Sequence, residues 1–190
     1  MPPSGGDEDA VASPRAMVLF DTRYGNTERV ARALARGMGA AGVKVDCGSI
    51  ASADAASLAG FDFIAIGGPT HYRSASVRMR EFLESLDQVD LSGKLGFAFD
   101  TRKESFWAGS AAKYIERRLR AKGVRMIWPT LSAWVFIPEG SAAPDGGIEK
   151  EELKELRRSQ VILGDKMEEL FEKTGGDIGK ALLGASGPPA

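Results

Sequence analysis

The chain has 190 residues, of which 43% are apolar and 27% charged, the composition of a globular protein with one core. Its 25 basic and 26 acidic residues nearly balance, which argues against a nucleic-acid binder. The single cysteine, Cys47, excludes an internal disulfide and a multi-cysteine metal site, and no apolar run approaches the roughly 18 to 20 residues that a membrane span requires.

The two ends of the chain differ in composition from the middle. Residues 1–14 have neither a positive start nor a long apolar stretch, so we expect a disordered leader rather than a secretory signal, and a cytoplasmic location. Residues 175–190 are rich in Gly, Pro and Ala, which predicts a flexible tail. Residues 15–174 are expected to form one domain.

Apolar runs alternate with helix-type periodicity along this domain. They predict strands over residues 17–20, 43–47, 61–67, 95–99 and 124–128 and helices over 28–40, 52–58, 75–86, 110–122 and 149–173. Residues 134–137 either continue the fifth strand beyond Pro129 or form an edge hairpin. This alternation predicts an α/β fold in three layers, with a doubly wound, five-stranded parallel sheet and helices on both faces.

Residues 37–42 match the pattern GxGxxG, which is known from dinucleotide-binding loops. That loop opens a helix after a strand, whereas this stretch follows a predicted helix. We therefore interpret the match as coincidental.

The stretch DTRYGNT, residues 21–27, connects the first strand to the first helix. Such a turn directs unpaired backbone N–H groups and the positive end of the helix at one point, which suits a phosphate. Thr22 and Thr27 supply hydroxyl donors, Gly25 permits close approach of the backbone, and Arg23 offsets phosphate charge. The alternative is a plain turn in which Thr27 caps the helix.

Two further loops carry unusual chemistry at the ends of predicted strands. GGPTHYRS, residues 67–74, follows the third strand, and DTRKESFW, residues 100–107, follows the fourth. Ligands of open α/β sheets bind at the carboxyl ends of strands, so the three loops form one binding site if the strands that they follow are neighbours in the sheet.

The motifs TRYGNT and GGPTHYRS resemble those of the flavodoxin-like family, and the resemblance covers roughly residues 15 to 173 at the level of the strand–helix pattern. It implies strand order 2-1-3-4-5 and the cofactor FMN. The implied phosphate loop comprises Thr22, Arg23, Tyr24, Gly25, Asn26 and Thr27. Tyr24 replaces the usual Thr or Ser and is similar to the SMYG loop of WrbA-type quinone reductases.

The same resemblance places Pro69, Thr70, His71 and Tyr72 beside the flavin's reactive edge. It also implies flavin contacts for Asp100, Thr101, Arg102 and Trp107, although the usual lead-in of the third loop is replaced here. Each has an alternative: Trp107 can pack under the fourth helix, His71 can face solvent, and Asp100 can cap the next turn. Asp21 does not indicate a CheY-like receiver, because residues 67–69 offer no phosphoacceptor aspartate.

The preferred hypothesis is therefore an FMN-binding electron-transfer protein with no catalytic residue or metal of its own. Arg23, Arg73, Arg78, Arg80, Arg102 and Lys103 are expected near the site, and this positive charge favours an acidic redox partner or NAD(P)H as donor. The alternatives are an FMN-dependent NAD(P)H:quinone oxidoreductase and a binding module of the same shape without flavin. The sequence leaves the oligomeric state open.

Overall fold

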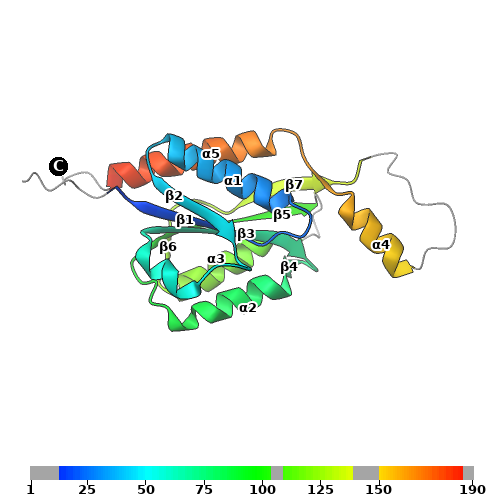
Figure 1. Cartoon of the computed structure of the whole chain (residues 1–190), viewed down its shortest axis with the longest axis horizontal. Coiled ribbons are helices and arrows are strands. Elements are labelled where there is room, and N and C mark those ends of the chain that lie inside the picture. Colours follow the sequence, from blue (N-terminus) through cyan, green and yellow to red (C-terminus); the bar gives the residue numbers. More distant parts are fainter. Residues whose placement is uncertain (1–12, 104–108, 139–149, 186–190) are drawn as a thin grey trace, which may run out of the picture.

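The computed structural model of the chain describes residues 13–103, 109–138 and 150–185, which form a sheet covered by helices on both faces (Figure 1). The strands are β1 (Arg15–Phe20), β2 (Lys44–Ser49), β3 (Phe63–His71), β4 (Ser74–Ala75), β5 (Leu95–Lys103), β6 (Arg125–Met126), β7 (Leu131–Phe136) and β8 (Ile162–Leu163). The helices are α1 (Asn26–Ala40), α2 (Val77–Ser85), α3 (Ala111–Ala121), α4 (Lys150–Ser159) and α5 (Met167–Ala185), with 3-10 turns η1 (Ala55–Gly60) and η2 (Leu86–Gln88).

The strand order of the sheet is β2-β1-β3-β5-β7-β8, and every neighbouring pair as far as β7 is parallel. The strands β6 and β7 pair with the start and the end of β5, so together they fill the fifth position. The predicted parallel order 2-1-3-4-5 is thereby confirmed, and the strand beyond Pro129 does continue the fifth position. Beyond the five predicted positions, β8 adds an antiparallel edge and β4 pairs with β3.

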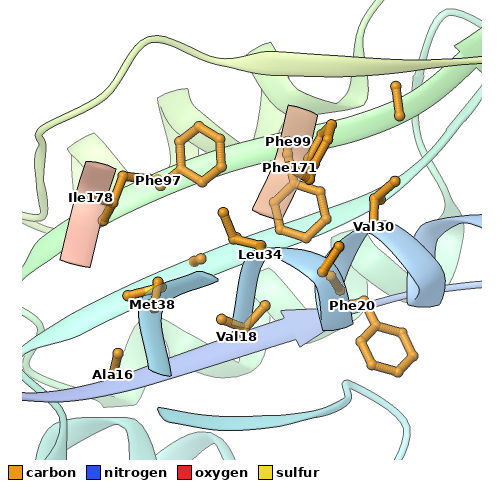
Figure 2. Close-up of a cluster of buried hydrophobic side chains, with 14 of the residues drawn as sticks. Ala16, Val18, Phe20, Val30, Leu34, Met38, Phe97, Phe99, Phe171 and Ile178 are labelled. Atoms are coloured by element: carbon orange, nitrogen blue, oxygen red, sulfur yellow. The ribbon is translucent and has the colours of Figure 1, made fainter. Parts of the chain in front are cut away.

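Two apolar cores hold the layers together. On one face, α1 and α5 cover β1, β3 and β5, and Figure 2 shows Leu34 of α1 and Phe171 of α5 meeting Phe97 and Phe99 of β5. The ring of Phe99 lies 5.6 Å from that of Phe171 in an edge-on arrangement, one of the geometries that aromatic pairs prefer. On the other face, α2 and α3 pack against the second core.

The expectation of one long helix over residues 149–173 is wrong. Helix α4 ends at Ser159, the short strand β8 follows, and α5 begins at Met167. The free edge of β7 explains the break, because β8 pairs there and the N–H of Gly164 donates to the carbonyl oxygen of Trp134 at 2.8 Å. Lys166 then adopts a left-handed φ of 62°, which turns the chain into α5.

The expectation of a flexible tail is also wrong for residues 175–185, since α5 continues to Ala185 with Ile178 and Leu182 buried, and residues 186–190 lie outside the described part. The glycines that indicated disorder allow α5 to lie close against α1. A Cβ on Gly175 would lie 2.1 Å from the carbonyl oxygen of Leu34, and one on Gly37 would lie 1.9 Å from that of Glu172. Gly37 opens the GxGxxG match, so this stretch serves helix packing.

Strands β1, β3 and β5 are neighbours and run in the same direction, so their carboxyl ends and the three loops lie at one edge of the sheet. Among the residues that the structure describes, no helix is both long and apolar enough to cross a membrane.

Candidate cofactor site

The first loop leaves β1 at Asp21 and enters α1 through Gly25. Gly25 has φ of 82° and ψ of −13°, the left-handed conformation that glycine adopts without steric cost. Its N–H donates to Oγ1 of Thr22 at 3.0 Å, which closes the turn. The loop therefore has a defined shape that its own residues maintain.

The first turn of α1 is suited to an anion. Among the residues that the structure describes, no side chain caps this helix, so the N–H groups of its first turn face the loop without a side-chain acceptor. Thr27, which is buried, places its Oγ1 2.8 Å from Oγ1 of Thr101 at the end of β5. Because one hydroxyl donates in this pair, the proton of the other is available to a ligand.

The second loop is a tight reversal between β3 and β4. His71 pairs with Ser74, and the two residues between them, Tyr72 and Arg73, have φ of 44° and 70°. Two successive residues with positive φ form the turn type that suits a hairpin, but Asn and Gly usually occupy it. The strained turn projects Tyr72, with 77% of its surface exposed, beside the ring of His71.

The third loop begins at Thr101 and Arg102 and returns at Gly109, with residues 104–108 lying outside the described part. Gly109 forms an isolated parallel bridge with Arg73, so the second and third loops touch. A Cβ on Gly109 would lie 2.2 Å from the carbonyl oxygen of Arg73, which explains the glycine. The first loop meets the third through Thr27 and Thr101, so all three loops converge as the sequence predicted.

A cavity of about 530 Å³ opens between the loops, within the range of small-molecule and cofactor sites. Most of the predicted site residues line it: Thr22, Arg23, Tyr24, Asn26, Thr27, Pro69, Thr70, His71, Tyr72, Thr101 and Arg102. Gly25 is not among the lining residues, and Trp107 lies outside the described residues. Their roles toward FMN remain predictions.

Asp100 does not belong to the cavity wall. It is fully buried, and its Oδ2 accepts from the hydroxyls of Thr70 and Ser110 and from the N–H of Ala112 at 3.0, 2.7 and 3.1 Å. It therefore ties β3 and β5 to the start of α3, the capping role given above as its alternative. Its other oxygen, Oδ1, is buried without a hydrogen-bond partner among the described residues, and the expected contact of Asp100 with the flavin stays a prediction.

Positive charge dominates the cavity wall. The cationic side chains that line it are those of Arg23, Arg73, Arg78, Arg102, Lys103 and Arg158. The carboxylate among the lining residues is Asp21, whose side chain is 4% exposed, pairs with Arg78 at 3.1 Å and accepts from the Ser76 hydroxyl at 2.5 Å. Arg80, which was also expected here, instead donates to the carbonyl oxygen of Ala75.

His71 responds to this environment. Burial, followed by the positive charges of Arg158 and Arg23, lowers the pKa of its imidazole below 6.5. The ring is thus favoured in its neutral form, which can both donate and accept a hydrogen bond.

Sequence reasoning missed several wall residues. Asp21 and Ser76 adjoin the predicted loops, so inspection of the loop ends could have found them. Arg158 and Val161 also line the cavity, but the prediction had placed them inside one continuous helix. Only the observed break between α4 and α5 brings them to the site.

Comparison with known proteins agrees with this geometry. The flavodoxin family model matches residues 18–135. A flavodoxin of Clostridium saccharobutylicum is 32% identical over 85 residues, which cover 44% of this chain and 53%, about half, of that protein. Among solved structures, a flavodoxin from the domain Archaea has a TM-score of 0.61 at 23% identity. That match covers 89% of this chain and 99% of the archaeal flavodoxin. A WrbA-like flavodoxin from Agrobacterium tumefaciens has a TM-score of 0.65 at 16% identity, with 90% and 99% covered.

Proposed function

Because the chain belongs to the flavodoxin family, we propose that it is an electron-transfer protein that binds FMN in the cavity at the carboxyl ends of β1, β3 and β5. The first loop holds the phosphate, and the second and third loops flank the ring. The observation that carries the proposal is the start of α1, which no side chain of the described residues caps, together with the hydroxyls of Thr22 and Thr27 on the wall of a cofactor-sized cavity.

The polar groups of the cavity fit this cofactor. Arg102 donates through Nη1 to the carbonyl oxygen of Gly109 at 2.7 Å, and its guanidinium lies 4.8 Å from the ring centre of Trp134. Its Nε is buried and has no acceptor among the described residues. A flavin ring presents carbonyl oxygens and a ring nitrogen that can accept such a bond, and the mononucleotide phosphate supplies the anion for the first loop.

The bound flavin supplies the redox chemistry, and the protein contributes geometry, exclusion of water and electrostatics. The cationic wall stabilises the negative charge that reduction adds, so it raises the reduction potential relative to free FMN. Asp21 limits this effect by neutralising Arg78 within the wall.

The same charges bear on the electron donor. A positive rim favours an acidic redox partner protein, or a phosphorylated nicotinamide, over a basic partner. The cytoplasmic location expected from the sequence stays a prediction.

A second candidate is an FMN-dependent NAD(P)H:quinone oxidoreductase. Tyr24 favours it because it is similar to the SMYG loop of WrbA-type quinone reductases. The cationic wall favours it because its side chains can bind the phosphates of a nicotinamide donor. Steady-state NADPH oxidation with a quinone, together with a measurement of molecular mass in solution, separates the two. A monomer that does not consume NADPH excludes the reductase.

The test of the proposal is reconstitution. The protein is purified with excess FMN, desalted and examined by visible spectroscopy, with riboflavin as the comparison ligand. We expect a bound flavin spectrum at about one equivalent. A titration that stays flat under all conditions would overturn the proposal and favour a flavodoxin-shaped binding module.

A further inference from the structure

The segment after β7 goes beyond the region that matches the flavodoxin family model. The match ends at residue 135, at the end of the fifth sheet position, and α4 and β8 follow before the last helix α5. Figure 1 shows α4 projecting from the body at the edge where the loops gather. The segment therefore lies outside the matched residues and next to the site.

Helix α4 contacts the first loop through one carboxylate. Oε1 of Glu155 accepts from the guanidinium of Arg23 at 2.7 Å and from the hydroxyl of Tyr24. Hydrogen bonding to Tyr24, the largest cause, and the charges of Arg23 and Arg158 lower the pKa of Glu155. Glu155 is not itself part of the cavity wall, whereas Arg23 and Tyr24 are, so it holds two wall residues from behind.

Two residues after Glu155 also contact the site. The carbonyl oxygen of Val161 accepts from the side-chain amide of Asn26 at 2.8 Å, which fixes a third side chain of the first loop. Arg158 lines the cavity directly, and its guanidinium lies 3.8 Å from the carboxylate of Glu155 one turn earlier in the same helix. The segment thus holds three side chains of the first loop and contributes Arg158 and Val161 to the cavity wall.

We infer that α4 completes the phosphate end of the FMN site, with Arg158 as an additional binding residue for the cofactor's anionic group and Glu155 as a positioning residue for Arg23. This inference rests on the proposed function. A guanidinium attracts a phosphate more strongly than a neutral ribityl end, so Arg158 distinguishes FMN from riboflavin. Glu155 acts through Arg23, because it orients that guanidinium without lining the cavity.

The test compares Arg158→Gln with Arg157→Gln in the full chain. Arg157 is the neighbouring arginine of the same helix, is exposed and is absent from the cavity wall, so it controls for general loss of positive charge. Affinities for FMN and riboflavin are measured by fluorescence titration at one salt concentration. We expect Arg158→Gln to weaken FMN about tenfold and riboflavin less than twofold, and Arg157→Gln to leave both ligands within about twofold. Equal losses for the two ligands, or equal effects of the two variants, would overturn the role of Arg158.

The positioning role needs a separate measurement. Glu155→Gln should weaken FMN in the wild-type background but have no effect in an Arg23→Gln background, since its action depends on that arginine. Glu151→Gln, an exposed carboxylate on the same helix, is the matched control. An undiminished effect of Glu155→Gln without Arg23 would refute the positioning role. Failure of the wild-type protein to bind FMN would refute the proposed function instead, so the two failures are distinguishable.

Discussion

Replacing Thr27 with valine tests whether the first loop holds a phosphate. Valine has nearly the shape of threonine but carries a methyl group in place of the hydroxyl. In the structure this hydroxyl is buried and lies 2.8 Å from that of Thr101, which is 5% exposed. The substitution therefore removes one group beside the start of α1 and leaves the Thr101 hydroxyl without its partner.

Both consequences have an expected size. Loss of one charge-assisted hydrogen bond costs about 1 to 3 kcal/mol, so FMN should bind roughly 5- to 150-fold more weakly. The unpaired Thr101 hydroxyl should lower the free energy of unfolding of the flavin-free protein by about 1 to 3 kcal/mol. The double variant Thr27→Val with Thr101→Val replaces both partners with apolar groups and should recover most of that stability.

The assay is a pair of titrations, with FMN and with riboflavin, alongside urea unfolding of the flavin-free protein. Riboflavin lacks the phosphate, so its affinity should hardly change. Thr174→Val is the control, because Thr174 is also buried but bonds to Leu170 within α5, away from the cavity. Equal losses for FMN and riboflavin would show that the first loop does not hold the phosphate.

Three further predictions concern stability and reactivity. Gly37→Ala should destabilise by about 1 to 3 kcal/mol or more, because its Cβ would meet the backbone of Glu172 at 1.9 Å, whereas Gly39→Ala, with nothing within 4 Å, should stabilise slightly; urea unfolding of both variants checks the pair. Because the pKa of His71 is lowered in the folded protein, the unfolded chain binds this proton first as the pH falls, so the free energy of unfolding should decrease below about pH 6.5. His71→Asn should make this decrease smaller, which unfolding measured at several pH values from about pH 7.5 to about pH 5 checks. Burial raises the pKa of Cys47 to about 11, so its reaction with a disulfide reagent near pH 8 should be on the order of 100-fold slower in the folded than in the unfolded protein, and equal rates would contradict the observed burial.

The layers were predictable because they depend on local patterns, whereas the strand order came from the resemblance to the flavodoxin-like family. Buried strands such as residues 61–67 are continuous apolar runs, and the helices between them show regular spacing of apolar residues. The carboxyl-terminal third was not predictable in the same way. Residues 149–173 have helical periodicity, but the free edge of β7 offered hydrogen bonds that a local pattern does not record. The glycines of α5 suggested a flexible tail for a related reason: they permit close contact with α1, which the local sequence does not record.

The candidate site also has one part that the sequence predicts and one part that it does not. The loops that directly follow β1, β3 and β5 are encoded locally, so their convergence follows from the strand order. Asp100 also directly follows a predicted apolar run, yet one oxygen of its carboxylate, Oδ2, accepts hydrogen bonds from Ser110 and Ala112 at the start of α3. Position at a strand end is predictable, whereas the direction of a side chain depends on its neighbours across the fold.

The positive charge of the site likewise depends on residues that only the fold brings together. The chain as a whole has a net charge of −1, yet the cationic residues of the cavity wall come from segments far apart in the sequence, near residues 23, 73, 102 and 158. Neither a short stretch of the sequence nor the net charge of the chain reveals that concentration of positive charge. The family fold determines where the cavity lies, and the arginines of this chain, with Asp21 and Glu155 as their buried and outer counter-charges, determine its electrostatic potential. Because an anionic cofactor and an acidic partner both respond to that potential, binding and partner choice depend on the same few guanidinium groups.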